Sequence, residues 1–113
     1  MTGTVVLTDL NDKTVISVEV DNIENKRCFS YVDNDSNKCE ISVYDDGLRL
    51  NKQGKDHSLV LNLRNDSYAL IGTPEGEVKL DIKVVDFIEK NDILVMHYIV
   101  DEIEREIKVI YGS

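Results

Sequence analysis

Residues 73–111 read TPEGEVKLDIKVVDFIEKNDILVMHYIVDEIEREIKVIY, and this stretch decides the fold. It opens with a turn signal at residues 73–76, after which apolar and charged side chains alternate strictly over residues 77–84. Two further apolar segments, residues 93–100 and 107–111, follow after polar breaks. Alternation with a period of two places the apolar side chains on one face of a strand. The stretch therefore predicts a three-strand antiparallel meander.

The rest of the chain repeats this pattern of short apolar segments between polar turns. Asp45-Asp46-Gly47 predicts a hairpin, because Asp-Gly tolerates the positive φ angles of tight turns. No window sustains the apolar spacing of a helix; the best candidate, residues 100–110, fits a strand as well, and we favour the strand. We expect seven further strands, at residues 5–10, 14–20, 27–32, 39–43, 48 to about 54, 59–63 and 67–71. Ten short strands are typical of an up-and-down barrel or a sandwich.

The composition narrows the class of protein. At 113 residues the chain has the size of one domain, and without Trp and with only 2 Phe its core must be aliphatic. The net charge of -9 and the absence of any Lys/Arg cluster argue against nucleic-acid binding and against docking on an anionic membrane. No signal peptide and no membrane-spanning apolar segment is seen. We expect a cytoplasmic protein.

Two cysteines, Cys28 and Cys39, can face each other across a hairpin if the turn falls at residues 33–34. A disulfide is conceivable there, but a cytoplasmic protein keeps its thiols reduced, so we expect free thiols. The two cysteines also lack the Cys-x-x-Cys spacing of redox and zinc motifs.

Other polar groups indicate no catalytic or metal site. Asp33, Asp35 and Asn37 imitate the first ligands of a calcium loop, but Lys38 and Tyr44 occupy the positions that need Gly and Glu. His57 and His97 are far apart and have no local cluster of ligands. We therefore expect no enzyme, no metal and no cofactor.

The segment Ile93–Val100 departs from a half-buried strand because both of its faces are apolar. One face can line a barrel, and the other must meet something else. Three interpretations are open: cover by the chain's own terminal segments, a homodimer contact, or the entrance for a ligand. For the homodimer we predict contact residues Leu94, Met96 and Tyr98.

From Cys39 onwards the order of segments resembles the YwiB-like family of small bacterial proteins with a calycin-like β-barrel. The resemblance rests on ISVYDDG at residues 41–47, KQG at 52–54, TPEGEV at 73–78 and the strand after it, the turn near Asn91, and the strand at 96–100. It covers about two thirds of the chain. It implies one antiparallel barrel of about ten strands over residues 1–113 and no enzyme chemistry.

Two hypotheses for function follow. The first is a non-catalytic module that binds a small apolar molecule inside the barrel. The second is a protein-interaction domain that self-associates through the apolar outer face of Ile93–Val100. The predicted inward side chains are bulky, which also suits a filled interior; they are Leu59, Leu61, Leu63, Val78, Leu80 and Ile82.

Overall fold

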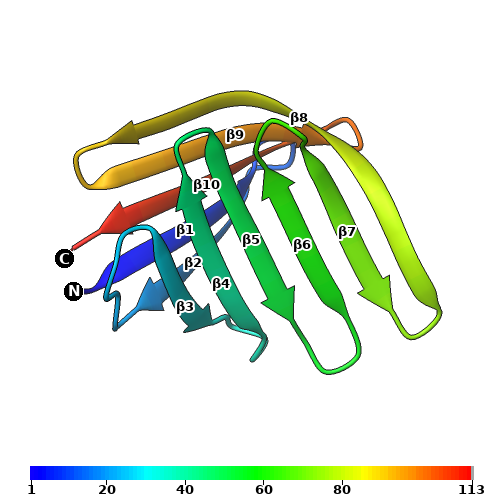
Figure 1. The fold of residues 1–113 in the computed structure, drawn as a ribbon, viewed down its shortest axis with the longest axis horizontal. Coiled ribbons are helices and arrows are strands. Elements are labelled where there is room, and N and C mark those ends of the chain that lie inside the picture. The colour runs from blue at the N-terminus through cyan, green and yellow to red at the C-terminus, as the bar shows by residue number, and fades with distance from the viewer. Residues whose placement is uncertain (113) are drawn as a thin grey trace.

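The computed structural model describes residues 1–112 as one antiparallel sheet of ten strands, without any helix in that range (Figure 1). The strands are β1 (Gly3–Asp9), β2 (Thr14–Val20), β3 (Cys28–Val32), β4 (Lys38–Tyr44), β5 (Gly47–Gln53), β6 (Ser58–Leu63), β7 (Tyr68–Thr73), β8 (Gly76–Lys90), β9 (Ile93–Val100) and β10 (Ile103–Tyr111). The sheet curls into a nearly closed barrel, which confirms the predicted all-β, up-and-down architecture.

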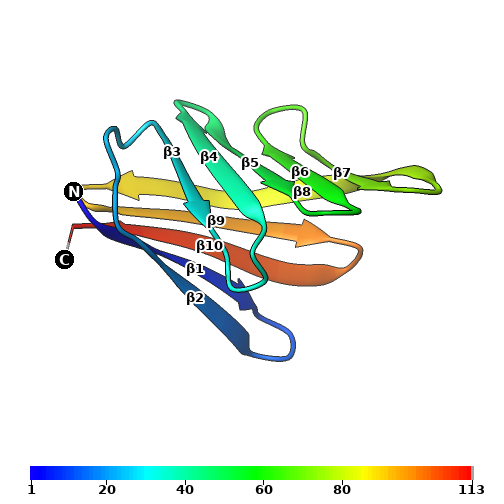
Figure 2. The same cartoon turned by 90° about the horizontal axis from the view of Figure 1, so that it is seen from below.

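The barrel is closed everywhere except at one seam. Strands β3 to β10 pair with their neighbours in sequence, β10 pairs back with β1, and β1 pairs with β2. The edges of β2 and β3 are paired with no other strand of residues 1–112. Figure 2 shows the β1–β2 hairpin diverging from the layer that contains β3 to β6. The barrel therefore widens toward the β1–β2 turn.

Strand β8 joins the two halves of the barrel. Its first residues pair with β7, from Gly76 to Asp81, and its later residues pair with β9, from Ile82 to Lys90. The register with β9 shifts between Val84 and Asp86, so that one extra residue is inserted there. Such a bulge bends a strand and increases its twist, which allows β8 to turn the corner between the halves.

The core lies on the inner face of the curled sheet. Its fully buried side chains come from strands in both halves: Val5, Ile41, Leu48, Leu63, Leu94, Met96, Ile107 and Val109. One end of the barrel is plugged by the edge-to-face pair Phe29 and Tyr111, whose ring centroids lie 5.9 Å apart. The hydroxyl of Tyr111 donates to the carbonyl of Lys26 at 2.9 Å, which holds residues 21–27 across that end.

The predicted strand boundaries near the C-terminus were too short. Strand β8 runs through Lys90, and β10 begins at Ile103 rather than Ile107. The β9–β10 turn is tighter than the polar break indicated, because Asp101 and Glu102 have positive φ angles of 51° and 66°. Two successive left-handed residues match a two-residue hairpin turn, which leaves the flanking residues free to pair.

The two cysteines are free, as expected. Cys28 pairs with Ser42 in the β3–β4 register and is exposed on the outer face, whereas Cys39 pairs with Tyr31 and is buried on the inner face. Thiols on opposite faces of a sheet cannot meet, so this hairpin cannot form the disulfide.

The β4–β5 hairpin depends on its glycine. Gly47 has a φ of 152°, and a Cβ there would collide with the carbonyl oxygen of Leu63 on β6. We expect Gly47→Ala to lower the free energy of unfolding by about 2 kcal/mol or more, because both backbone strain and a steric clash oppose it. Urea denaturation measures this.

Gly76 provides the matched control for that substitution. Its φ of 139° is also unfavourable for alanine, but no atom lies within 4 Å of the position of its Cβ. Gly76→Ala should therefore cost only about 1 kcal/mol of backbone strain. Equal losses in the two variants would show that the contact with Leu63 is unimportant.

Candidate functional site

The wide end of the barrel contains two adjoining cavities, of about 350 and 240 Å³. Both are lined by Leu7, Ile16, Leu50 and Lys52, so they form one cleft between the β1–β2 hairpin and the opposite layer. We call this cleft the mouth. It opens at the end of the barrel and along the seam between β2 and β3, since side chains of both edge strands line the smaller cavity.

Next to the mouth, the inner face of the sheet carries apolar side chains that are only partly covered. The predicted inward set does face inward in the strand registers, but only Leu61 and Leu63 are buried. Leu59 and Leu80 are half-buried, and Val78 is 53% exposed. The interior is therefore filled at one end of the barrel and open at the other.

A polar cluster marks the seam side of the mouth. Lys52, which faces inward from β5, places its Nζ 3.1 Å from the carboxylate of Asp33. Asp33 also accepts hydrogen bonds from the backbone N–H groups of Asp35 (3.0 Å) and Asn37 (2.9 Å) and from the side-chain amide of Asn37 (3.2 Å). Burial alone would raise the pKa of Asp33, but these partners outweigh it and lower the pKa to about 2.

Two reactive types of side chain at the mouth are held in their neutral forms. Burial raises the pKa of the Cys39 thiol, and the nearby Asp33 carboxylate adds to the effect. Burial likewise raises the pKa of Tyr31, which lines the same cavity. A thiol with a raised pKa is less often in its nucleophilic thiolate form.

The other side of the mouth carries Arg105 and Tyr98. These residues lie opposite each other in the β9–β10 register and line the larger cavity with Leu61. Tyr98 is only 4% exposed, and burial raises its pKa to about 12. Sequence reasoning missed Arg105 as an inward residue, although it continues the alternation of Ile107 and Val109.

The predicted interface residues Leu94, Met96 and Tyr98 were assigned to the wrong face. The structure places all three in the core, at 0%, 0% and 4% exposure, so they cannot contact a partner. The outer face of β9 carries the alternate residues, including Ile93 and His97. The polar His97 in the sequence was the available signal for the outward face.

A larger hollow, of about 860 Å³, lies over β3 to β6. Its outward-facing side chains, such as Glu40, Arg49 and Asn51, come from a single layer of the sheet. The mouth is enclosed by strands of both halves and has a continuous apolar floor, which is the usual form of a small-molecule site. We therefore regard the mouth as the candidate site.

The remaining sequence candidates are dispersed. His57 is exposed in the β5–β6 loop, while His97 lies on the outer face with its Nε2 at 3.6 Å from a carboxylate oxygen of Glu104. Among residues 1–112, no three Cys, His, Asp or Glu side chains are close enough to share a metal ion. The same residues include no helix with the length and hydropathy of a membrane span.

Comparison with known proteins gives one structural likeness. No family model matches the sequence, and no curated protein is similar to it. The fold is similar to the crystal structure of ywiB protein from Bacillus subtilis, with a TM-score of 0.44 and 15% sequence identity. The alignment covers 99% of this chain and 89% of that one.

The Asp33 cluster generates a prediction about stability and pH. Because its folded pKa of about 2 lies below the unfolded value near 3.8, the carboxylate stabilises the fold above about pH 4 and loses this effect as the pH falls to about 2. Asp33→Asn should lower the free energy of unfolding at neutral pH by roughly 1–3 kcal/mol. The deficit should shrink between pH 4 and pH 2 in urea titrations.

Asp35→Asn removes the same charge from the same loop and serves as the control. Its side chain makes none of the hydrogen bonds that hold Asp33. A comparable loss of stability in both variants would attribute the effect to net charge rather than to the Asp33 contacts.

Proposed function

We propose that this protein is a non-catalytic binding domain that holds a small, largely apolar molecule in the mouth. The observation that carries the proposal is the partly exposed apolar inner face at the wide end of the barrel, where Leu59 and Leu80 are half-buried and Val78 is 53% exposed. An apolar ligand that binds in a concave site removes exposed aliphatic surface from water, which favours binding.

The dimensions and position of the mouth support the proposal. Its larger cavity, of about 350 Å³, falls at the lower end of the range of small-molecule sites, roughly 300–1,000 Å³. It is lined by Leu7, Leu50, Leu59 and Leu61 from both halves of the barrel. The protonated Cys39 and the fully hydrogen-bonded Asp33 favour a binding role over a catalytic one.

We also propose that the protein belongs to the YwiB-like family and is cytoplasmic. The residues that resemble that family support its membership, and a calycin-like barrel with an open end is compatible with a binding protein. Of the predicted bulky inward residues, which also suited a filled interior, only Leu61 and Leu63 are buried, and Leu59 and Leu61 line the mouth.

The binding proposal predicts the effect of one charge in the mouth. We expect decanol to bind the protein with a stoichiometry of one, and Leu59→Asp to weaken binding about tenfold or more, because a short carboxylate would be buried against the alkyl chain. Isothermal titration calorimetry measures both. Native mass spectrometry of protein purified from cells reports any ligand already bound.

Val60→Asp is the matched control, since Val60 is the next residue of β6 and points to the outer face. It should leave decanol binding unchanged. Absence of decanol binding together with a ligand-free monomer in the mass spectrum would contradict the proposal.

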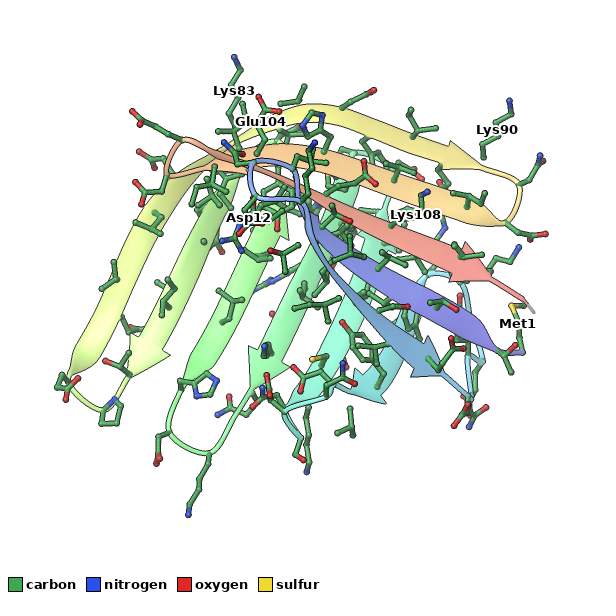
Figure 3. All side chains as sticks on the ribbon, turned by 180° about the vertical axis from the view of Figure 1, so that it is seen from behind. Met1, Asp12, Lys83, Lys90, Glu104 and Lys108 are labelled. Atoms are coloured by element: carbon green, nitrogen blue, oxygen red, sulfur yellow. The ribbon has the colours of Figure 1, made fainter. Side chains whose placement is uncertain are left out.

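Self-association through the outer face of β9 is the second candidate. Ile88 and Ile93 are 47% and 45% exposed there, and each has an aliphatic register partner, Val95 and Ile110. Lys90 and Lys108 lie on the same side of the molecule (Figure 3), where they can attract the acidic surface of a second copy of this chain. This surface replaces the predicted contact at Leu94, Met96 and Tyr98.

This second candidate predicts a dimer that one substitution disrupts. Ile93→Lys should weaken dimerisation about tenfold or more, since it puts a charge in the centre of the apolar contact. Sedimentation velocity measures the effect, with Val15→Lys, at an exposed position of β2, as the control. A monomeric wild-type protein, or a dimer that tolerates Ile93→Lys, would exclude this face.

A further inference from the structure

Strand β2 leaves one of its edges without a hydrogen-bonding partner. Its other edge pairs with β1 along the whole strand, from Thr14 to Val20. Outside the strand pairs, no backbone–backbone hydrogen bond of residues 1–112 includes a residue of β2. The β1–β2 hairpin diverges from the layer of β3 (Figure 2), so β3 does not fill this position. A row of unpaired N–H and C=O groups is a template for a further strand.

This edge also lacks the features that usually prevent a strand from pairing with another chain. The sequence of β2, TVISVEV, contains no Pro and no Lys, and its register with β1 has no bulge. Most of its residues are β-branched, which favours the extended conformation. Val15 and Ile16 are 59% and 47% exposed, although they lie on opposite faces of the strand. The edge is therefore suited to accept another strand.

The charged side chains beside β2 are available to a partner, whereas those beside β3 are not. Lys13 and Asp21 flank β2, and neither takes part in the five ion pairs of residues 1–112. The charged side chains that flank β3 are paired within the chain: Lys26 with Asp92, Arg27 with Glu89, and Asp33 with Lys52. Of the two edge strands, β2 is thus the one that offers free charges at both ends.

These features are complementary to a second copy of the same edge. When two β2 strands pair antiparallel about a two-fold axis at Ser17, the central residue, all seven residues of each strand have a partner. On the inner face, Ile16 then lies opposite Val18 of the partner subunit, as an apolar cross-strand pair. The same register places Lys13 opposite Asp21 of the partner subunit, once at each end. A shift by one residue would oppose inner and outer faces.

We propose that the protein forms a dimer through the edge of β2, in which the sheets of two copies join into one continuous sheet. This contact goes beyond the proposed binding function. It is also separate from the outer face of β9, because β1 and β10 lie between β2 and β9 in the sheet. The two-fold arrangement is closed, whereas pairing of β2 with β3 of the next copy would continue into an open filament. The matching charges of Lys13 and Asp21 favour the closed arrangement.

Charge reversal tests the register of this dimer, with sedimentation velocity as the measurement. Lys13→Asp opposes two acids at both ends of the contact and should weaken dimerisation about fivefold or more. Asp21→Lys should have a similar effect, because it opposes two lysines. The double variant Lys13→Asp/Asp21→Lys re-forms both pairs with the charges exchanged, so it should recover the affinity of the wild-type protein.

Ser17→Lys tests the position of the axis. It brings two like charges together at the centre of the contact and should weaken dimerisation about tenfold or more. Ser30→Lys is the matched control, because Ser30 is the exposed central residue of β3, the other edge strand. It should leave the dimer unchanged. Val15→Lys should not disrupt this dimer either, since it places a lysine opposite Glu19 of the partner subunit.

A wild-type protein that stays monomeric at every concentration measured would overturn the inference, as would a dimer that tolerates both Lys13→Asp and Ser17→Lys. Failure of the double variant to recover dimerisation would overturn the proposed register. Disruption by Ser30→Lys would overturn the two-fold contact in favour of β2–β3 pairing, and disruption by Ile93→Lys alone would assign the dimer to the outer face of β9. None of these outcomes affects ligand binding in the mouth, which the decanol titration tests separately.

Discussion

The constraint on which the rest of the structure depends is the bulge in β8. Strict alternation from Val84 would turn Asp86 inward and Phe87 outward. The extra residue between Val84 and Asp86 reverses the parity, so that Phe87 lies opposite the buried Met96 and Asp86 lies opposite the outward His97. A single strand can thereby present apolar side chains to both halves of the barrel while it bends between them. Without that reversal, Phe87 would face outward and Asp86 would face the core.

The two ends of the barrel differ because the chain covers only one of them. Residues 21–27 cross the plugged end, where Lys26 pairs with Asp92 at 2.6 Å and Arg27 pairs with Glu89 at 2.9 Å. The backbone N–H of Val43 also donates to Arg27 at 2.7 Å. No comparable segment of residues 1–112 spans the other end, which has only the two-layer cleft and the unpaired edges of β2 and β3. Because residues 21–27 cover only one end of the barrel, the interior is filled at that end and open at the other.

Alternation was sufficient to predict most of the fold, since period-two patterns report directly on faces of strands. All ten strands and the free thiols were predicted, and Thr14–Val20 and Ile93–Val100 had the correct bounds. Where both faces of a strand are apolar, alternation cannot distinguish inside from outside, and Leu94 was misassigned for this reason. The β8 bulge and the β2–β3 seam were not predicted, because they depend on pairing between distant segments rather than on local pattern.

The mouth was the least predictable feature, although every residue in it obeys the same alternation. On β5 the inward residues are Leu48, Leu50 and Lys52, and on β10 the aliphatic run of Val109 and Ile107 ends at Arg105. In the sequence, each of these polar residues indicates only that an apolar strand pattern is ending. The fold places these strand ends around one opening, so that separate breaks in alternation become a polar rim above an apolar floor. Such a site is created by the register of the sheet, so no single sequence motif reveals it.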